Sequence, residues 1–131
     1  KLSGRKVEYI QDCARRTAEG LLDANTLSSM DDEAAIEELT KVRGIGRWTA
    51  EWVLMRALGR LDLLPAGDVA LRRVVSELYF GGETIAEAQL AEFAVERWSP
   101  YRGLATTYLF ACIRQQRIAN EAAKAAPEAA V

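Results

Sequence analysis

Residues 39–50 decide the fold, and they read Leu39-Thr40-Lys41-Val42-Arg43-Gly44-Ile45-Gly46-Arg47-Trp48-Thr49-Ala50. Two helical segments meet here at a tight turn that contains Gly44 and Gly46. We expect Leu39, Val42 and Ile45 to anchor the two helices on each other. The two glycines allow positive φ angles and let another backbone approach closely. The first amides of the second helix then point outward, and such amides bind a phosphate.

A turn of this kind predicts a DNA-binding hairpin that contacts phosphates without reading bases. The residues that we assign to DNA binding are Arg43, Gly44, Ile45, Gly46, Arg47 and Thr49. For an isolated Gly-x-Gly the alternative would be an ordinary glycine at the end of a helix. The longer pattern from residue 39 to residue 50 favours the hairpin.

A single carboxylate follows the hairpin, in Pro65-Ala66-Gly67-Asp68. Asp68 stands where a further helix begins, and the positive end of the helix dipole favours its anion. In isolation such an aspartate is usually only an N-cap. An ionised carboxylate can also stabilise a developing positive charge, and it can orient or deprotonate water. Such a charge develops when an N-glycosidic bond is cleaved, because the sugar comes close to an oxocarbenium cation.

With these motifs the chain resembles the helix-hairpin-helix DNA glycosylases, and among them the 3-methyladenine DNA glycosylase II branch. The run from Trp98 to Ala105 is similar to the signature Trp-x-Pro-aromatic-Arg-x-x-Ala of that family. The resemblance implies an all-α fold, a catalytic role for Asp68, and a monovalent cation that bridges the hairpin backbone to DNA. Arg43 departs from the family pattern, in which proline commonly precedes the first glycine. We expect the turn to tolerate this exchange.

The resemblance also bears on the type of reaction. Bifunctional members carry a lysine two residues after the second hairpin glycine, and its amine attacks the sugar. That position is Trp48 here, and no lysine lies between Lys41 and Lys124. We therefore expect a monofunctional glycosylase that uses water as the nucleophile and needs no cofactor.

The aromatic residues near these motifs predict a pocket for an extruded base. We assign Trp48, Tyr101 and Phe110 to this pocket, whereas we expect Trp98 to lie in the core and Arg102 to be structural. An electron-rich wall would attract the cationic ring of an alkylated purine. The sequence does not rank 3-methyladenine, 7-methylguanine, hypoxanthine or ethenoadenine as substrates.

Composition narrows the class of protein. The chain has 131 residues, a formal net charge of −2, two cysteines and no histidine. The residue types exclude a cysteine- or histidine-rich metal site and a four-cysteine iron–sulfur cluster, which disfavours the mismatch glycosylases that carry one. No apolar run approaches the ~20 residues of a membrane span. Two free thiols suggest a reducing compartment, and we expect a cytoplasmic, nucleoid-associated protein.

Charge is unevenly distributed along the chain. Residues 17–40 contain acidic but no basic residues, whereas residues 41–60 contain five basic residues and only one acid, Glu51. A basic segment centred on the glycine turn fits a protein that touches double-stranded DNA on one side. A solvated charged surface is the alternative.

Helical periodicity covers nearly the whole chain, and we expect no strand. The predicted helices run from Ser3 to Gly20, from Asp31 or Asp32 to the hairpin, and over residues 47–58, 68–79, 84–98 and 101–119. Residues 21–29 are expected to form a turn. A Thr84–Glu87 capping box and Pro100 at the first helical position mark the last two helix starts.

The resemblance covers residues 1–118, which we take as a helix-hairpin-helix glycosylase domain followed by an alanine-rich tail over residues 119–131. In the family, further N-terminal helices supply part of the pocket and the residue that replaces the flipped base. We expect these helices to be missing here, or to be supplied by a second chain. A non-catalytic DNA-binding module and a helical interaction domain remain the alternatives.

Overall fold

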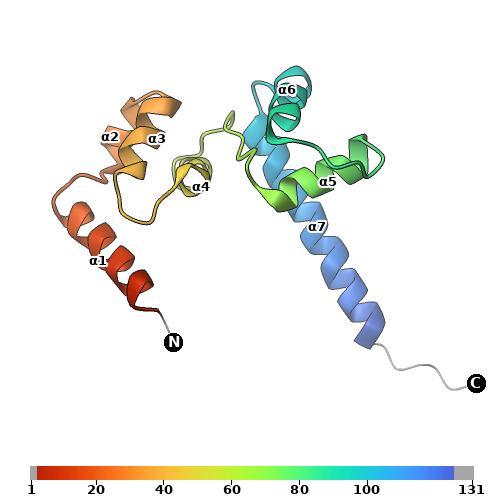
Figure 1. Ribbon diagram of the computed structural model, residues 1–131, viewed down its shortest axis with the longest axis horizontal. Coiled ribbons are helices and arrows are strands. Elements are labelled where there is room, and N and C mark those ends of the chain that lie inside the picture. The colour runs from red at the N-terminus through yellow and green to blue at the C-terminus, as the bar shows by residue number, and fades with distance from the viewer. Residues whose placement is uncertain (1–2, 126–131) are drawn as a thin grey trace, which may run out of the picture.

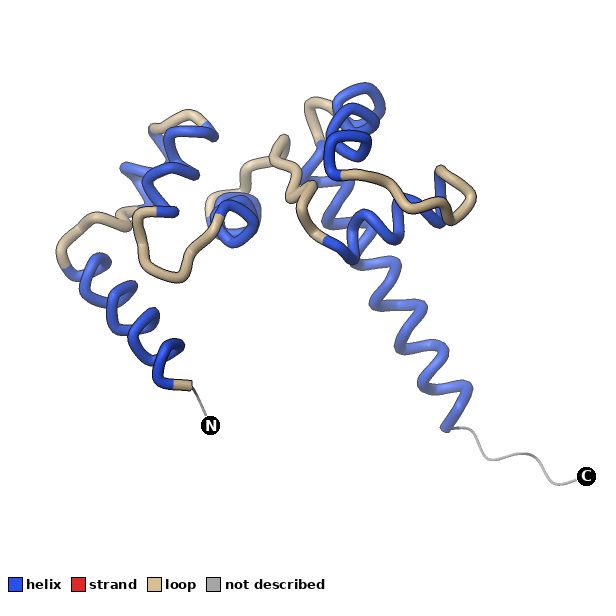
Figure 2. The backbone as a smooth tube through the Cα atoms, in the orientation of Figure 1, coloured by secondary structure: helices blue, strands red, loops and turns tan. Residues whose placement is uncertain are grey.

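The computed structural model describes residues 3–125, and this part of the chain contains helices and loops only (Figures 1 and 2). The prediction of an all-α fold is confirmed. The helices are α1 (Gly4–Ala18), α2 (Ala24–Ser29), α3 (Asp32–Thr40), α4 (Arg47–Ala57), α5 (Val69–Tyr79), α6 (Glu87–Trp98) and α7 (Arg102–Ala125). Among the described residues, no helix has the length and apolar character needed to cross a membrane.

The helices form two groups, each with its own hydrophobic core. In the first group α3 packs on α4, and its core includes Ile36, Leu39 and Leu54. In the second group α5, α6 and α7 surround a core that includes Leu71 and Leu90. Figure 1 shows α1–α4 on one side of the molecule and α5–α7 on the other. A functional site built from α4 and α5 therefore spans both groups.

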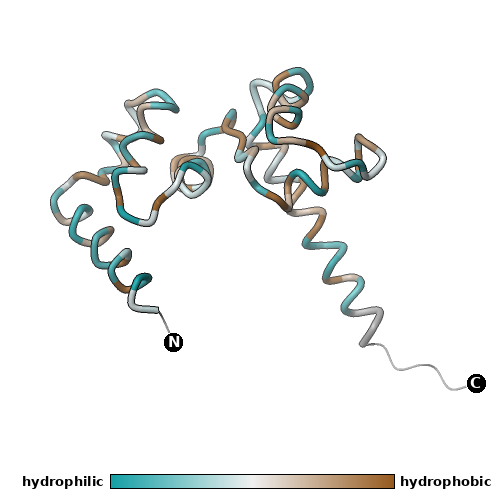
Figure 3. The backbone as a smooth tube through the Cα atoms, viewed as in Figure 1, coloured by the Kyte–Doolittle hydropathy of each residue, from teal (hydrophilic) through white to brown (hydrophobic). Residues whose placement is uncertain are grey.

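The connection between α4 and α5 passes from one core into the other. Leu63 is 6% exposed and packs in the first core, while the adjacent Leu64 is 8% exposed and packs in the second. In Figure 3 this connection, which lies between the two groups of helices, contains both hydrophobic and hydrophilic stretches. Burial of two consecutive leucines on opposite sides holds the connection in place.

The start of α7 is fastened to the same connection. The guanidinium of Arg102 donates to the carboxylate of Asp62 from Nε at 2.8 Å and from Nη2 at 2.9 Å. The backbone N–H of Gly103 donates to the carbonyl oxygen of Leu61 at 2.8 Å. Such a charge-assisted pair with two parallel bonds is strong and fixes orientation. Arg102 is therefore structural, as predicted.

Three helix starts follow the expected capping chemistry. The side chains of Ser3, Asp31 and Asp68 cap α1, α3 and α5 by accepting hydrogen bonds from backbone amides in the first turn. Each such cap stabilises its helix by about 1 kcal/mol.

Two local predictions were wrong. Residues 21–29 contain the short helix α2, which Asp23 caps by accepting from the N–H of Thr26 at 2.8 Å. A six-residue helix is too short to show an apolar period, so the sequence pattern missed it. The start of α6 lies at Ala86 rather than Thr84, and Gln89 Oε1 accepts from the N–H of Ala86 at 2.8 Å.

The last helix also differs from its prediction at both ends. Pro100 is not in its first turn, because the helix begins at Arg102 after a cis Ser99–Pro100 peptide bond. There Asp62 accepts from the backbone N–H of Arg102 at 3.1 Å, so the connection supplies the cap. The helix continues to Ala125 and crosses the predicted boundary between residues 118 and 119. Residues 126–131 of the predicted tail lie outside the described residues.

Gly103 should be intolerant of a side chain. A Cβ atom there would lie 3.0 Å from the carbonyl oxygen of Leu61 and 3.1 Å from that of Leu63. We expect Gly103→Ala to lower the free energy of unfolding by about 1–3 kcal/mol, because the backbone of the connection must shift. Gly4→Ala is the matched control, since nothing lies within 4 Å of a Cβ at that helical glycine. Urea denaturation of the two variants checks this, and equal stabilities would contradict it.

Candidate nucleic-acid interface and active site

The predicted hairpin is formed by the end of α3, a short turn and the start of α4. Val42 is 1% exposed and Leu39 is 3% exposed, so both anchor the turn on the first core. Gly44 has φ of +92°, in the region that favours glycine, and the N–H of Ile45 donates to the carbonyl of Val42 at 3.0 Å. Gly46 has φ of −95°, so the expectation of a positive φ there was wrong.

The two glycines therefore serve different purposes. A Cβ at Gly44 would lie 2.4 Å from the ring of Tyr9, so α1 covers this side of the turn closely. At Gly46 nothing lies within 4 Å of the position of a Cβ. The open side of the turn is thus the side of Gly46, where α4 begins.

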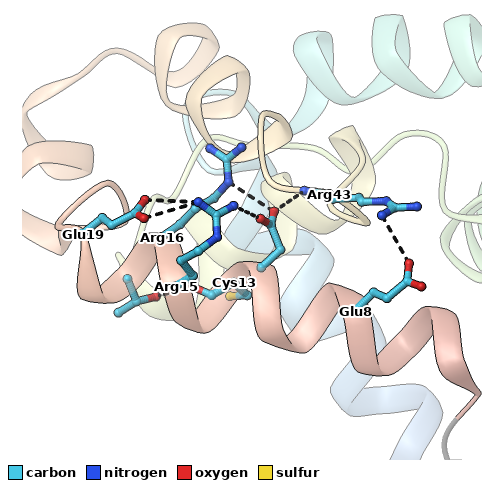
Figure 4. A network of polar contacts seen from close by, with 8 residues as sticks. Glu8, Cys13, Arg15, Arg16, Glu19 and Arg43 are labelled. Atoms are coloured by element: carbon cyan, nitrogen blue, oxygen red, sulfur yellow. Dashed lines mark hydrogen bonds and ion pairs between the residues drawn. The ribbon is translucent and has the colours of Figure 1, made fainter.

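A carboxylate of α1 holds the turn from behind. Asp12 accepts from the backbone N–H of Arg43 at 3.1 Å and from the side chain of Arg16 at 3.2 Å, and it also pairs with Arg15. Figure 4 shows the side chains of Arg15 and Arg16 directed at this point of α1, whereas the side chain of Arg43 extends toward Glu8. The hydrogen bond from the Arg43 amide is the largest cause that lowers the pKa of Asp12 below its ordinary value.

Arg43 is turned toward α1 as well. Its guanidinium pairs with Glu8 at 3.2 Å and lies 6.0 Å from the centre of the Tyr9 ring. The structure thus explains why a charged residue fits before the first glycine. The Arg43 side chain packs along α1 and does not disturb the turn. The Arg43–Glu8 pair is exposed, so it is weak and a phosphate can compete for the arginine.

The N-terminus of α4 is the exposed feature of the hairpin. Gly46 is its N-cap, and no side chain accepts a hydrogen bond from the first turn. The amides at residues 47–49 are therefore free of side-chain partners, and the dipole of an 11-residue helix ends there. Thr49 lies half-buried in this first turn. Geometry of this kind can bind an anion through backbone amides.

Arg47 has a structural partner on each side. Its guanidinium donates to Glu33 at 2.6 and 2.9 Å and to Glu51 at 3.0 Å. Glu51 is only 6% exposed, and burial raises its pKa while Arg47 acts in the opposite direction. The pKa of Glu33 is lowered by the hydrogen bond from Arg47. The side chain predicted to contact DNA is therefore engaged within the protein, which leaves the backbone amide at this position for a phosphate.

The basic segment around the hairpin is largely neutralised by the acidic segment that precedes it. Four of its five basic residues pair with acids: Lys41 with Glu38, Arg43 with Glu8, Arg47 with Glu33, and Arg60 with Asp32. Arg60 also donates to the backbone carbonyls of Leu27 and Met30 and is mostly buried. These charges form ion pairs within the protein more than they form a basic surface. The open N-terminus of α4 is then the feature of the hairpin that could bind an anion.

Asp68 is the N-cap of α5 and also reaches the hairpin helix. One carboxylate oxygen, Oδ1, accepts from the N–H groups of Ala70 at 2.9 Å and Leu71 at 3.0 Å. The other, Oδ2, accepts from the indole Nε1 of Trp48 at 2.8 Å. The predicted catalytic carboxylate and the predicted pocket residue at position 48 are thus in direct contact.

Beside Asp68 lies a cavity of about 550 Å³ between α4 and α7. It is lined by Trp48, Trp52, Arg56, Asp68, Phe110, Ile113, Arg114 and Arg117. Two of the three predicted pocket residues, Trp48 and Phe110, are present. Tyr101 is half-exposed and is not among the lining residues. Asp68 is the only carboxylate of the lining.

The aromatic wall of the cavity contains one residue that the sequence analysis missed. Trp52 lies between Trp48, at 6.5 Å between ring centres, and Phe110, at 5.4 Å, and meets both edge to face. It follows Trp48 by one helical turn, so the spacing of four residues on α4 was the available signal. The guanidinium of Arg56 lies 4.6 Å from the centre of the Trp52 ring. The Trp52 ring is therefore already engaged by a cation of the protein itself.

Other candidate residues are structural. Trp98 packs against Phe93 and Tyr79 at the edge of the second core, as predicted. Asp62, an acid of the connection between α4 and α5, is bound to Arg102, and this bond is the main cause that lowers its pKa. Its carboxylate is engaged in holding the connection, which leaves Asp68 as the acid available at the aromatic cavity.

Known proteins are similar to this chain in sequence and in fold. Residues 1–100 match the family described as HhH-GPD superfamily base excision DNA repair protein. The chain belongs to this superfamily. The match covers the whole hairpin, Asp68 and the first three residues of the signature at residues 98–105.

Similar HhH-GPD proteins are 3-methyladenine glycosylases. The crystal structure of a Bacillus halodurans DNA-3-methyladenine glycosidase is 41% identical, with a TM-score of 0.72 over 82% of this chain and 49% of that one. A Schizosaccharomyces pombe 3-methyladenine DNA glycosylase in complex with abasic DNA is 31% identical, with a TM-score of 0.75 over 82% of this chain and 52% of that one. A Bacillus subtilis DNA-3-methyladenine glycosylase is 36% identical over 84% of this chain and 36% of its own length. The chain thus spans half or less of most relatives that it matches.

Gly46→Asp should separate DNA binding from folding. Aspartate is a good N-cap and has room at this position, so we expect the free energy of unfolding to stay equal or to rise by a few tenths of a kcal/mol. Its carboxylate would occupy the open N-terminus of α4 and repel a phosphate. Affinity for duplex DNA should then fall at least about tenfold, measured by fluorescence anisotropy at fixed salt.

Gly46→Asn is the control, because it caps the helix without a charge and should lose less affinity. Equal affinities of wild type and Gly46→Asp would show that phosphate does not bind at this helix end.

The Asp12 carboxylate should make the attachment of α1 depend on pH. Its pKa is lowered in the folded protein from an ordinary value of 3.8, so its stabilising effect is present above that pH and is lost as the pH falls further. We expect wild type to exceed Asp12→Asn in free energy of unfolding at pH 5–7, with the difference shrinking below about pH 4. Urea unfolding of both proteins across this range measures it; a difference that is independent of pH would contradict it.

Proposed function

We propose that this chain is the hairpin-bearing part of a monofunctional DNA glycosylase that hydrolyses the N-glycosidic bond of alkylated purines such as 3-methyladenine in double-stranded DNA. The observation that carries this assignment is the position of Asp68, whose carboxylate lies at an aromatic cavity and contacts the helix of the hairpin. A module that only docks on DNA needs neither the carboxylate nor the cavity.

DNA is held through its backbone in this proposal. The open N-terminus of α4 binds a phosphate through the amides after Gly46, and Thr49 and the competing guanidinium of Arg43 add to this contact. Base identity plays no part in it, so the hairpin can bind at any sequence. A monovalent cation at the hairpin backbone would strengthen the same contact.

The damaged nucleotide is extruded so that its base enters the cavity between α4 and α7. Trp48 and Phe110 provide the flat surfaces for the base, and Asp68 lies next to its sugar. As the glycosidic bond breaks, positive charge develops on the sugar and the Asp68 carboxylate stabilises it. A base that is already cationic leaves without protonation, which suits a cavity that offers no side-chain acid besides Asp68.

Water completes the reaction. No lysine occurs between Lys41 and Lys124, so no amine is present at position 48 to form a Schiff base with the sugar. The product is therefore an abasic site with an intact DNA backbone. The relatives carry further sequence, and we propose that helices outside these 131 residues, or a second chain, complete the cavity and fill the space of the flipped base.

A test compares wild type with Asp68→Asn, using the protein in its natural length. Asparagine keeps an oxygen for the α5 cap, so the fold is preserved, but it removes the negative charge. We expect wild type to release free base from methylated duplex DNA, and Asp68→Asn to be slower by on the order of 10²-fold or more. Binding to DNA with an abasic site should be retained in the variant.

The alternative is a non-catalytic DNA-binding module. It predicts that neither protein releases base while both bind DNA with the same dependence on salt concentration. Strand cleavage at the abasic product by wild type would instead contradict the monofunctional assignment.

A further inference from the structure

One hydrogen bond links the hairpin helix to the proposed catalytic carboxylate. Trp48 is the second residue of α4 and lies in the first turn, whose amides at residues 47–49 have no side-chain partner, and Asp68 is the N-cap of α5. The indole Nε1 of Trp48 donates to Asp68 Oδ2 at 2.8 Å. Because α4 packs in the first core and α5 in the second, this bond crosses from one group of helices to the other.

The two oxygens of Asp68 are held by different parts of the molecule. Oδ1 is bound by the amides of Ala70 and Leu71, which belong to the same helix as Asp68 itself. These bonds relate the carboxylate to α5 only. Oδ2 has Trp48 as its donor, and this bond fixes the rotation of the carboxylate and its distance from α4. Rotation about this side-chain bond is otherwise soft.

We propose that Trp48 is a positioning residue, whose indole N–H fixes the Asp68 carboxylate relative to the helix end that binds the DNA phosphate. This inference rests on the proposed function. The phosphate sets where the nucleotide lies, and the carboxylate must meet the sugar of that nucleotide. A displacement of about 1 Å between reacting groups can cost on the order of 10²-fold in rate.

Trp52 offers a comparison within the same wall. It lies one turn further along α4 and lines the same cavity as Trp48. Its indole Nε1 is buried and has no hydrogen-bond partner within the described part of the chain. Replacement of either tryptophan by phenylalanine removes similar ring area from the cavity, but only Trp48→Phe removes the bond to Asp68.

The bond itself can be detected by NMR in this chain. The indole N–H resonances of the three tryptophans are assigned from Trp→Phe variants. Asp68→Ser keeps an N-cap oxygen for α5 but is too short to reach the indole. We expect it to shift the Trp48 indole resonance upfield and to leave that of Trp98 in place. An unchanged Trp48 resonance would overturn the inference without bearing on catalysis.

The effect on catalysis is measured as the single-turnover rate of base release at saturating protein. We expect Trp48→Phe to be slower than Trp52→Phe by about tenfold to a hundredfold, with both variants binding abasic-site DNA alike. Trp52→Phe reports the cost of replacing an indole ring in the same aromatic wall. In an Asp68→Asn background, Trp48→Phe should cost no more than Trp52→Phe does, because its action through the carboxylate is gone.

Three outcomes decide between the proposals. Equal losses in the two phenylalanine variants, with Asp68→Asn inactive, overturn the positioning role while the proposed function stands. The positioning role is also overturned if Trp48→Phe slows base release more than Trp52→Phe by the same factor in wild type and in Asp68→Asn. Trp48 would then act independently of Asp68. Absence of base release by wild type overturns the proposed function, and the positioning role with it.

Discussion

The attachment of the α4–α5 connection to the start of α7 is the constraint on which the site depends. Arg102 binds Asp62 through two parallel hydrogen bonds, and Gly103 lies against the carbonyl of Leu61 with no room for a side chain. These contacts fix a segment whose two leucines enter different cores. Since Asp68 ends that segment, its distance from the hairpin is set by the junction as much as by its own helix.

The hairpin uses glycine for two distinct physical reasons. Gly44 adopts a positive φ and lies under the ring of Tyr9, so it serves the fold. Gly46 has an ordinary φ and no close neighbour, and it leaves the end of α4 open. The lack of a side chain at Gly46 keeps the first amides of α4 accessible. An N-cap residue with a side-chain acceptor would occupy amides that an external anion can use.

Of the sequence features, the distribution of charge predicted the candidate DNA-binding surface least well. In the sequence the basic segment looks unpaired, because its acidic partners lie in other segments, on α1 and α3. Folding brings them together, and Arg47 closes over the buried Glu51. Most of the positive charge therefore stabilises contacts between helices. In the proposed function, association with DNA therefore relies on backbone amides and on weak surface pairs that a phosphate can replace.

Local sequence determined the positions of all helices except α2, the polar caps at Ser3, Asp31 and Asp68, and the hairpin, because these depend on residues a few positions apart. It also pointed to Trp48 and Phe110. Only the tertiary structure decided that Asp68 bonds to Trp48, that Trp52 and Arg56 share the cavity, and that Tyr101 lies outside it. These contacts join α4, α5 and α7 across two cores. The spacing of residues along one helix does not determine how another helix is rotated against it.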